Sequence, residues 1–100
     1  MDYTYVDREK FNRMLGVCVR EQRMRLGLTH ADVARTTGIS AGRLHRIENG
    51  QVSLSNENLD LFKRVLRLED ETLDHMLEIA RVAFIDQFLT TVYEAAGDTL

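Results

Sequence analysis

The sequence predicts an all-α fold, and three observations support this prediction. The chain of 100 residues contains no proline and only six glycines, so little in it would interrupt a helix. Apolar residues recur at spacings of three and four, and the alternating β-branched runs typical of strands are absent. An apolar content of 44% in a chain of this length suffices for one core. We therefore expect a single domain of about five helices.

The first predicted helix covers residues 7–26, where apolar side chains recur at helical spacing. Gly16 interrupts this pattern, which leaves two interpretations open: a bend at this residue, or a helix that begins near it. Gly27 follows the last apolar residue and predicts the end of the helix. For the N-terminal stretch at residues 1–11, two alternatives also stay open: an extension of the helix into a subunit contact, or partial disorder.

Two short helices are predicted next, over residues 30–37 and 41–49. Thr29 and Ser40 are suitable N-caps, and Gly38 supplies the positive φ that a tight turn between the helices requires. Two short helices joined by a three-residue turn form the helix-turn-helix arrangement, whose second helix can enter a DNA major groove. The side chains expected to fix the crossing of these helices are small or apolar: Val33, Ala34, Ile39, Leu44 and Ile47.

The fourth predicted helix begins at Ser55 or Asn56, and the fifth begins near Asp70 and meets no breaker before Gly97. Apolar residues of the fifth helix form two stripes. The first stripe contains Leu73, Leu77, Ala80, Phe84, Phe88 and Val92, and the second contains Ile79, Val82, Ile85 or Leu89, and Tyr93.

One apolar stripe can be buried by the helix's own domain, whereas two stripes require a second surface. We therefore predict that residues 79–96 pair with a second copy of the chain in a twofold dimer. The predicted interface residues are Val82, Ile85, Phe88, Leu89, Val92 and Tyr93. The alternative is a last helix that folds back over its own domain.

The formal net charge of −3, taken alone, argues against a nucleic-acid partner. Its distribution reverses that inference, because residues 8–50 sum to +5 and residues 69–100 sum to −7. The basic half is the half that contains the predicted helix-turn-helix. A basic face opposite an acidic far end is typical of a DNA-binding domain.

Several function classes are excluded by what the sequence lacks. A single cysteine, Cys18, rules out a disulfide scaffold and a multi-cysteine zinc site, and it fits the reducing cytosol. The three histidines have no metal-ligand spacing, and no catalytic triad, nucleotide-binding glycine motif or phosphate loop is present. We expect no enzyme activity, no metal and no cofactor. With no signal peptide and no membrane-length apolar run, we expect a cytoplasmic, nucleoid-associated protein without membrane contact.

Residues 16–77 resemble the phage repressor/Cro type of helix-turn-helix domain, also called the Xre family. The matching residues are Gly16, Val19, Arg20 and Arg23, followed by GLTHADVA (27–34), TGISAGRLHRIENG (37–50) and LDLFKRVLRL (59–68). The resemblance implies a five-helix, lambda-repressor-like domain with its helix-turn-helix motif at residues 30–49. Residues 1–15 would then be an N-terminal extension of the first helix, and residues 78–100 would be the extended C-terminal helix, the predicted dimerisation element.

The resemblance also implies roles for individual residues. Arg23 and Glu48 match a structural ion pair that ties the first helix to the recognition helix. The positions that read bases match Arg43 and Arg46, together with Ala41 and Gly42. Arginine suits this task because its planar fork meets guanine O6 and N7 bidentately. The positions expected to contact the DNA backbone are His30, Ser40, His45, Asn49 and Gln51.

These observations predict a sequence-specific DNA-binding transcriptional regulator that represses as a homodimer on a palindromic operator in double-stranded DNA. The two half-sites would lie about 34 Å apart. A different class stays open: a protein-interaction module or antitoxin-like protein with the same fold and weak or no DNA binding. Short side chains at Ala41 and Gly42 and the uncharged loop at residues 51–56 favour that alternative. A regulatory protein partner is a further possibility, because no ligand-binding domain is present.

Overall fold

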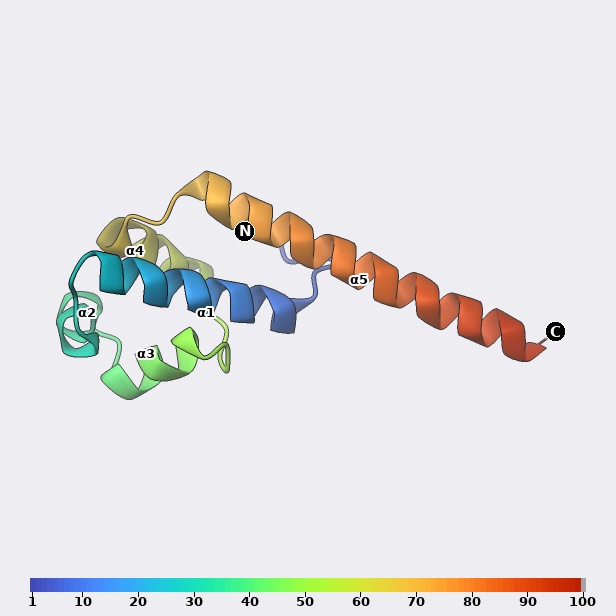
Figure 1. Ribbon diagram of the computed structural model, residues 1–100, viewed down its shortest axis with the longest axis horizontal. Helices are drawn as coiled ribbons and strands as arrows, with labels where there is room; N and C mark the ends of the chain where they lie inside the picture. Colours follow the sequence, from blue (N-terminus) through green and yellow to red (C-terminus); the bar gives the residue numbers. More distant parts are fainter. Residues whose placement is uncertain (100) are drawn as a thin grey trace.

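Five helices in sequence order make up the fold (Figure 1): α1 (Arg8–Arg25), α2 (His30–Thr37), α3 (Ala41–Glu48), α4 (Asn56–Leu66) and α5 (Asp70–Thr99). The structure is a computed structural model that describes residues 1–99, with side chains for residues 1–97. Within these residues no strand occurs. The prediction of an all-α, five-helix fold with a long C-terminal helix is confirmed.

Polar N-caps start the first four helices. The side chain of Asp7 accepts a hydrogen bond from the backbone N–H of Lys10 at 3.0 Å, which satisfies a donor of the first turn of α1. Thr29 forms a reciprocal capping box with Asp32 at the start of α2. Ser40 and Ser55 cap α3 and α4, each through a side chain that accepts one backbone N–H bond, so Ser55 is the cap of α4 and Asn56 its first residue.

The interpretation that the first helix begins near Gly16 is wrong, because α1 runs without interruption from Arg8 to Arg25. Gly16 instead allows α1 to approach the C-terminal end of α3. A Cβ atom on Gly16 would lie 2.5 Å from the carbonyl oxygen of Glu48 and 2.6 Å from that of Ile47. Only a glycine therefore fits at position 16. The other glycine expected to interrupt a helix, Gly97, does not end the last one, since α5 continues to Thr99.

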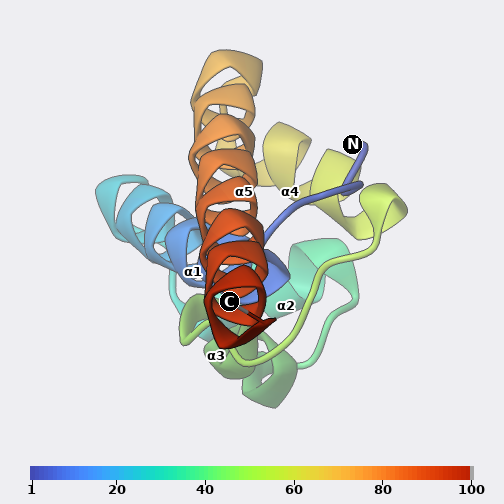
Figure 2. The same ribbon diagram turned by 90° about the vertical axis from the view of Figure 1, so that its right-hand side faces the viewer.

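The core is built around α1, which contacts α3, α4 and α5. In both views of the molecule α1 lies between α5 and α3 (Figures 1 and 2), while α2 packs on α3 and α4. Burial of large apolar side chains from all five helices is the main source of stability. The most completely buried are Phe11, Val19, Val33, Leu44, Ile47, Phe62, Leu66 and Leu73.

The predicted N-terminal extension of the first helix is helical only from Arg8 onward. Residues 1–7 are not helical and form an N-terminal segment along α5. The backbone N–H of Asp7 donates to the carbonyl of Ala80 at 3.0 Å, and a guanidinium N–H of Arg81 donates to the carbonyl of Asp2 at 3.1 Å. Val6 is buried in the core, and the ring of Tyr3 meets that of Phe11 edge to face. The segment is thus part of the domain and holds the middle of α5 against it.

The last helix leaves the domain about midway along its length. Leu73, Met76, Leu77 and Ala80 are buried, but every side chain described from Ile85 onward is exposed. The first predicted stripe is therefore buried only in its N-terminal half, because the domain ends there. The helix does not fold back; it projects away (Figure 1) and gives the molecule a longest dimension of 59 Å. None of the helices described here has the length and apolarity needed to cross a bilayer.

The close approach at Gly16 predicts a large effect of a small substitution. Gly16→Ala places a methyl group against two backbone carbonyls that cannot rotate away, so we expect a loss of about 2–3 kcal/mol in the free energy of unfolding. Urea denaturation followed by circular dichroism measures this loss.

Gly42→Ala is the matched control, because Gly42 is also helical and nothing lies within 4 Å of an added Cβ. Alanine should stabilise the protein there by about 0.5–1 kcal/mol. Equal effects of the two substitutions would contradict the close contact between α1 and α3.

Candidate nucleic-acid interface

The helix-turn-helix unit consists of α2, a tight turn at Gly38 and α3. Gly38 has φ of 76°, a left-handed conformation that favours glycine, and its N–H donates to the carbonyl of Ala34 at 2.8 Å. The next residue, Ile39, is buried and ties the turn to the core. The other apolar positions predicted to fix the crossing are buried as well: Val33, Leu44 and Ile47.

The opposite face of α3 is open to solvent. All four positions predicted to contact bases are exposed there: Ala41, Gly42, Arg43 and Arg46. Arg43 and Arg46 lie three residues apart and so share one side of the helix. The small residues at 41 and 42 precede them in the first turn. The exposed face of α3 thus presents two guanidinium groups next to a surface on which side chains are short or absent.

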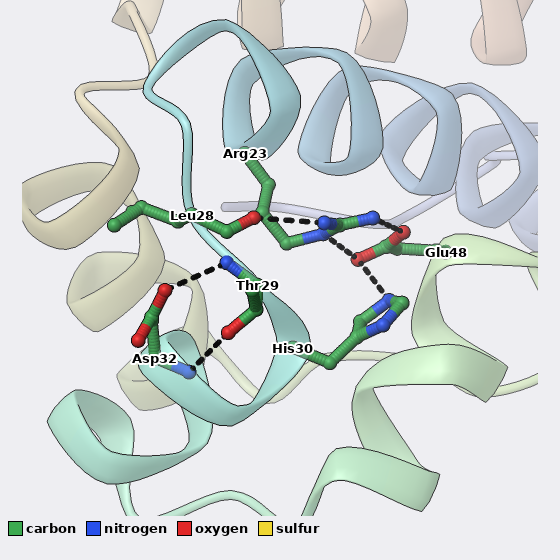
Figure 3. Close-up of polar contacts among 6 residues, drawn as sticks. All are labelled: Arg23, Leu28, Thr29, His30, Asp32 and Glu48. Carbon is green, nitrogen blue, oxygen red and sulfur yellow. Dashed lines mark hydrogen bonds and ion pairs between the residues drawn. The ribbon is translucent and has the colours of Figure 1, made fainter.

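A buried charge cluster holds α3 against α1 (Figure 3). Arg23 of α1 donates through Nε to Glu48 Oε2 at 2.8 Å and through Nη2 to Glu48 Oε1 at 3.0 Å, a bidentate geometry. A third N–H of Arg23 donates to the carbonyl of Leu28 at 2.9 Å. The exposed fractions of the two side chains are 12% for Arg23 and 4% for Glu48. The pair therefore joins α1, the residues before α2, and the C-terminal end of α3.

The surroundings keep this pair ionised. Burial acts to raise the pKa of Glu48, but the hydrogen bonds and charge of Arg23, together with the nearby His30, outweigh burial and hold that pKa below its ordinary value. The hydrogen bond to Glu48 raises the pKa of Arg23 against the opposing effect of desolvation. At neutral pH the cluster thus contains a full negative and a full positive charge in direct contact.

His30, predicted to contact the DNA backbone, has a partly exposed side chain that points toward this cluster (Figure 3). Its Nε2 lies 3.0 Å from Glu48 Oε2, although the N–H is not well aligned for a hydrogen bond. The His30 ring also meets the ring of His45 edge to face, with 4.8 Å between centroids. The side chain of His30 thus supports the α2–α3 contact, a role that sequence spacing did not reveal.

The other predicted backbone contacts lie along the edge of α3, and all are exposed: Ser40, His45, Asn49 and Gln51. The hydroxyl of Ser40 accepts from the N–H of Arg43 at 3.2 Å, so this side chain also caps the helix. Asn49 is the C-cap, and the N–H of Gln51 donates to the carbonyl of Arg46 at 2.9 Å. These bonds fix the two ends of α3 relative to its exposed face.

Two contacts of the site were not predicted. Gly50 adopts φ of 72°, and a Cβ there would lie 2.9 Å from Cα of Arg13, so the chain leaving α3 passes directly over α1. The carbonyl of Leu28 also accepts from Arg23. The position of Gly50, just after a helix, was a signal in the sequence for its contact with α1. The bond from Arg23 to the Leu28 carbonyl has no such signal, because any residue supplies a backbone carbonyl.

The predicted dimer residues of α5 lie far from this interface along the chain. Val82, Ile85, Phe88, Leu89, Val92 and Tyr93 have exposed fractions of 45–75%. In the part of the chain that the structure describes, no group of three or more His, Cys, Asp or Glu side chains is arranged to hold a metal ion. Cys18 is half-buried, and burial raises the pKa of its thiol.

Removing one partner of the cluster should destabilise the domain. Arg23→Met leaves the Glu48 carboxylate buried with only His30 beside it, and we expect a loss of about 3 kcal/mol in the free energy of unfolding. Arg35→Met is the control, since Arg35 pairs with Asp32 on the surface. The urea midpoint should fall for the first variant and stay unchanged for the second. Equal midpoints for both would contradict a stabilising role of the Arg23–Glu48 pair.

Comparison with known proteins agrees with this geometry. A family model described as "Helix-turn-helix domain" matches residues 14–76, which is more than half of the chain. No curated protein and no solved structure matches it. The matched range contains α2, the turn, α3 and both residues of the Arg23–Glu48 pair. The chain therefore belongs to the helix-turn-helix domain family, which indicates a DNA-binding protein.

Proposed function

We propose that this protein is a sequence-specific transcriptional regulator of the phage repressor/Cro (Xre) type that represses by occupying promoter DNA. The observation that supports this function best is the exposed face of α3, where Arg43 and Arg46 project from a helix fixed by a buried ion pair. A recognition helix must be held rigidly if its side chains are to distinguish bases. Repression by occupancy requires no catalytic residue.

In this proposal Arg46 and Arg43 read guanine edges in the major groove, and Ala41 contacts a thymine methyl group. Gly42 adds no side chain, so the first turn of α3 can approach the bases closely. Backbone phosphates are contacted by Ser40, His45, Asn49 and Gln51, and by the first-turn N–H groups of α2 that begin at His30. The side chain of His30 acts through Glu48 rather than as a direct phosphate ligand.

The proposal includes a homodimer formed through α5. The exposed apolar residues of its C-terminal half cluster on one side, and a lone helix that projects into water is marginally stable without a partner. A twofold dimer would recognise a palindromic operator whose half-sites are one or more whole DNA turns apart, about 34 Å per turn.

A second candidate function rests on the same exposed helix. An antitoxin-like or other interaction module would use the apolar end of α5 to bind a different protein and would bind DNA weakly or not at all. Binding to generic duplex DNA at increasing salt separates the candidates. A DNA-binding protein weakens steeply as salt rises, because released counterions favour the complex, whereas an interaction module shows no binding to weaken.

Selection of duplexes from a random pool, followed by affinity measurement, tests the proposed function. We expect an enriched site, and Arg46→Ala should reduce the free energy of binding to it by about 1–3 kcal/mol and relax the preference at one base pair. Arg64→Ala is the control, because Arg64 is an exposed arginine on α4, outside the proposed contact segment. If no DNA site is enriched at low salt, the proposal that the protein is a sequence-specific regulator is contradicted.

Sedimentation of the purified protein tests the dimer. Wild type should sediment as a dimer at tens of micromolar, and the double variant Phe88→Asp/Leu89→Asp should be a monomer, because two charges would be buried without partners. Both side chains are exposed in the single chain, so the monomer should keep its helical content. A double variant that remains a dimer would exclude α5 as the interface.

A further inference from the structure

The exposed half of α5 contains a regular apolar stripe. Val82, Ile85, Leu89 and Val92 follow one another at spacings of three, four and three, which is the pattern of positions a and d in a two-stranded coiled coil. All four are about half exposed in the single chain. We call these four residues the α5 stripe.

The α5 stripe faces away from the domain. Successive residues of an α-helix are rotated by about 100°, which puts the centre of the stripe about 150° from the centre of the face buried by Leu73, Met76, Leu77 and Ala80. Lys10 of α1 lies near Val82, and Tyr5 of the N-terminal segment packs on Phe84 next to Ile85, so these two neighbours flank the N-terminal end of the stripe. All four stripe residues keep about half of their surface exposed, so a second α5 can contact them beside these neighbours.

We infer that two copies of α5 pair along this stripe in parallel and in register; this inference rests on the proposed homodimer. Residues that flank a and d decide the orientation of a coiled coil, because in a parallel pair position g contacts position e five residues later on the other helix. With Val82 at a, Arg81 occupies g and Asp86 occupies e. Each Arg81 thus meets Asp86 of the second copy, and the symmetry forms this opposite-charge contact twice.

The next pair of flanking positions is complementary as well. Phe88 at g meets Tyr93 at e of the second copy, and both rings are exposed in the single chain, at 59% and 75%. Aromatic pairs of this kind add to the energy of burial. The guanidinium of Arg81 is already oriented at the helix surface, since one of its N–H groups donates to the carbonyl of Asp2.

An antiparallel pairing of the same stripe lacks these contacts. Layers of a against d would place Val82 opposite Val92 and Ile85 opposite Leu89, and positions e would then adjoin one another. Asp86 would lie beside Asp86 of the second copy, and Arg81 would adjoin an alanine, Ala95, rather than an acidic residue. Like charges in contact oppose association, so the charge pattern favours the parallel pair.

Disulfide cross-linking in a Cys18→Ala background tests the orientation. In a parallel pair each d residue faces its own copy, so Ile85→Cys and Val92→Cys should both form cross-linked dimers on mild oxidation. In an antiparallel pair neither variant cross-links to itself, but a mixture of Val82→Cys and Val92→Cys chains does. Glu94→Cys, at the outward position f, is the control that should stay monomeric on a denaturing gel.

Charge reversal gives an independent measurement by sedimentation. Arg81→Glu and Asp86→Arg should each raise the dissociation constant of the dimer about tenfold, and the double variant should return it to within about threefold of wild type. Glu94→Arg matches the charge change of Asp86→Arg and should leave the constant within about threefold. Rescue by the double variant separates pairing across the dimer from the Arg81–Asp2 contact within one chain.

The outcomes separate this inference from the proposed function. A dimer in which the Val82–Val92 mixture alone cross-links overturns the parallel register and leaves the proposed dimer intact. A wild-type chain that stays monomeric at tens of micromolar overturns the dimer and with it this inference. A duplex selected by a monomer would support the regulator and overturn only the pairing of α5.

Discussion

The arrangement of the domain depends on the contact between α1 and the C-terminal end of α3. Gly16 lets the two backbones approach, and the bidentate pair of Arg23 with Glu48 fixes their relative rotation. Without the first contact the helices would have to separate, and without the second a buried carboxylate would lose its main partner. Because α3 carries the proposed base-reading arginines, the same contact that stabilises the core also orients the DNA-facing surface.

Sequence reasoning predicted the elements whose causes are local. Thr29, Ser40 and Ser55 cap helices through side chains three residues from the donors they satisfy, and Gly38 turns the chain by its own φ. The direction of the His30 ring, in contrast, depends on Glu48, which is eighteen residues away and reaches it only after α2 and α3 have packed. The close approach at Gly16 was not predicted for the same reason, since the atoms that require a glycine lie on another helix.

The N-terminal segment and α5 show a second limit of periodicity. Residues 1–6 gave no signal of packing, yet Val6 is buried and the backbone of Asp7 bonds to Ala80. Periodicity detected two apolar stripes on α5 but could not locate where the domain stops covering the first one. That limit is set by the length of α1 and the path of residues 1–7, which are properties of the assembled fold.

The fold separates the acidic and the basic residues of the chain in space. The acidic residues that outweigh the basic half lie largely on α5, and α3 is on the opposite side of α1 (Figures 1 and 2). DNA phosphates would repel α5 and attract the arginines of α3, so the field of the whole chain favours one approach to a duplex. An acidic α5 also disfavours nonspecific contact of this helix with DNA, which would leave its apolar residues available for the proposed pairing with a second copy. The separation of charge thus supports both proposed surfaces at once, recognition on one side of α1 and self-association on the other.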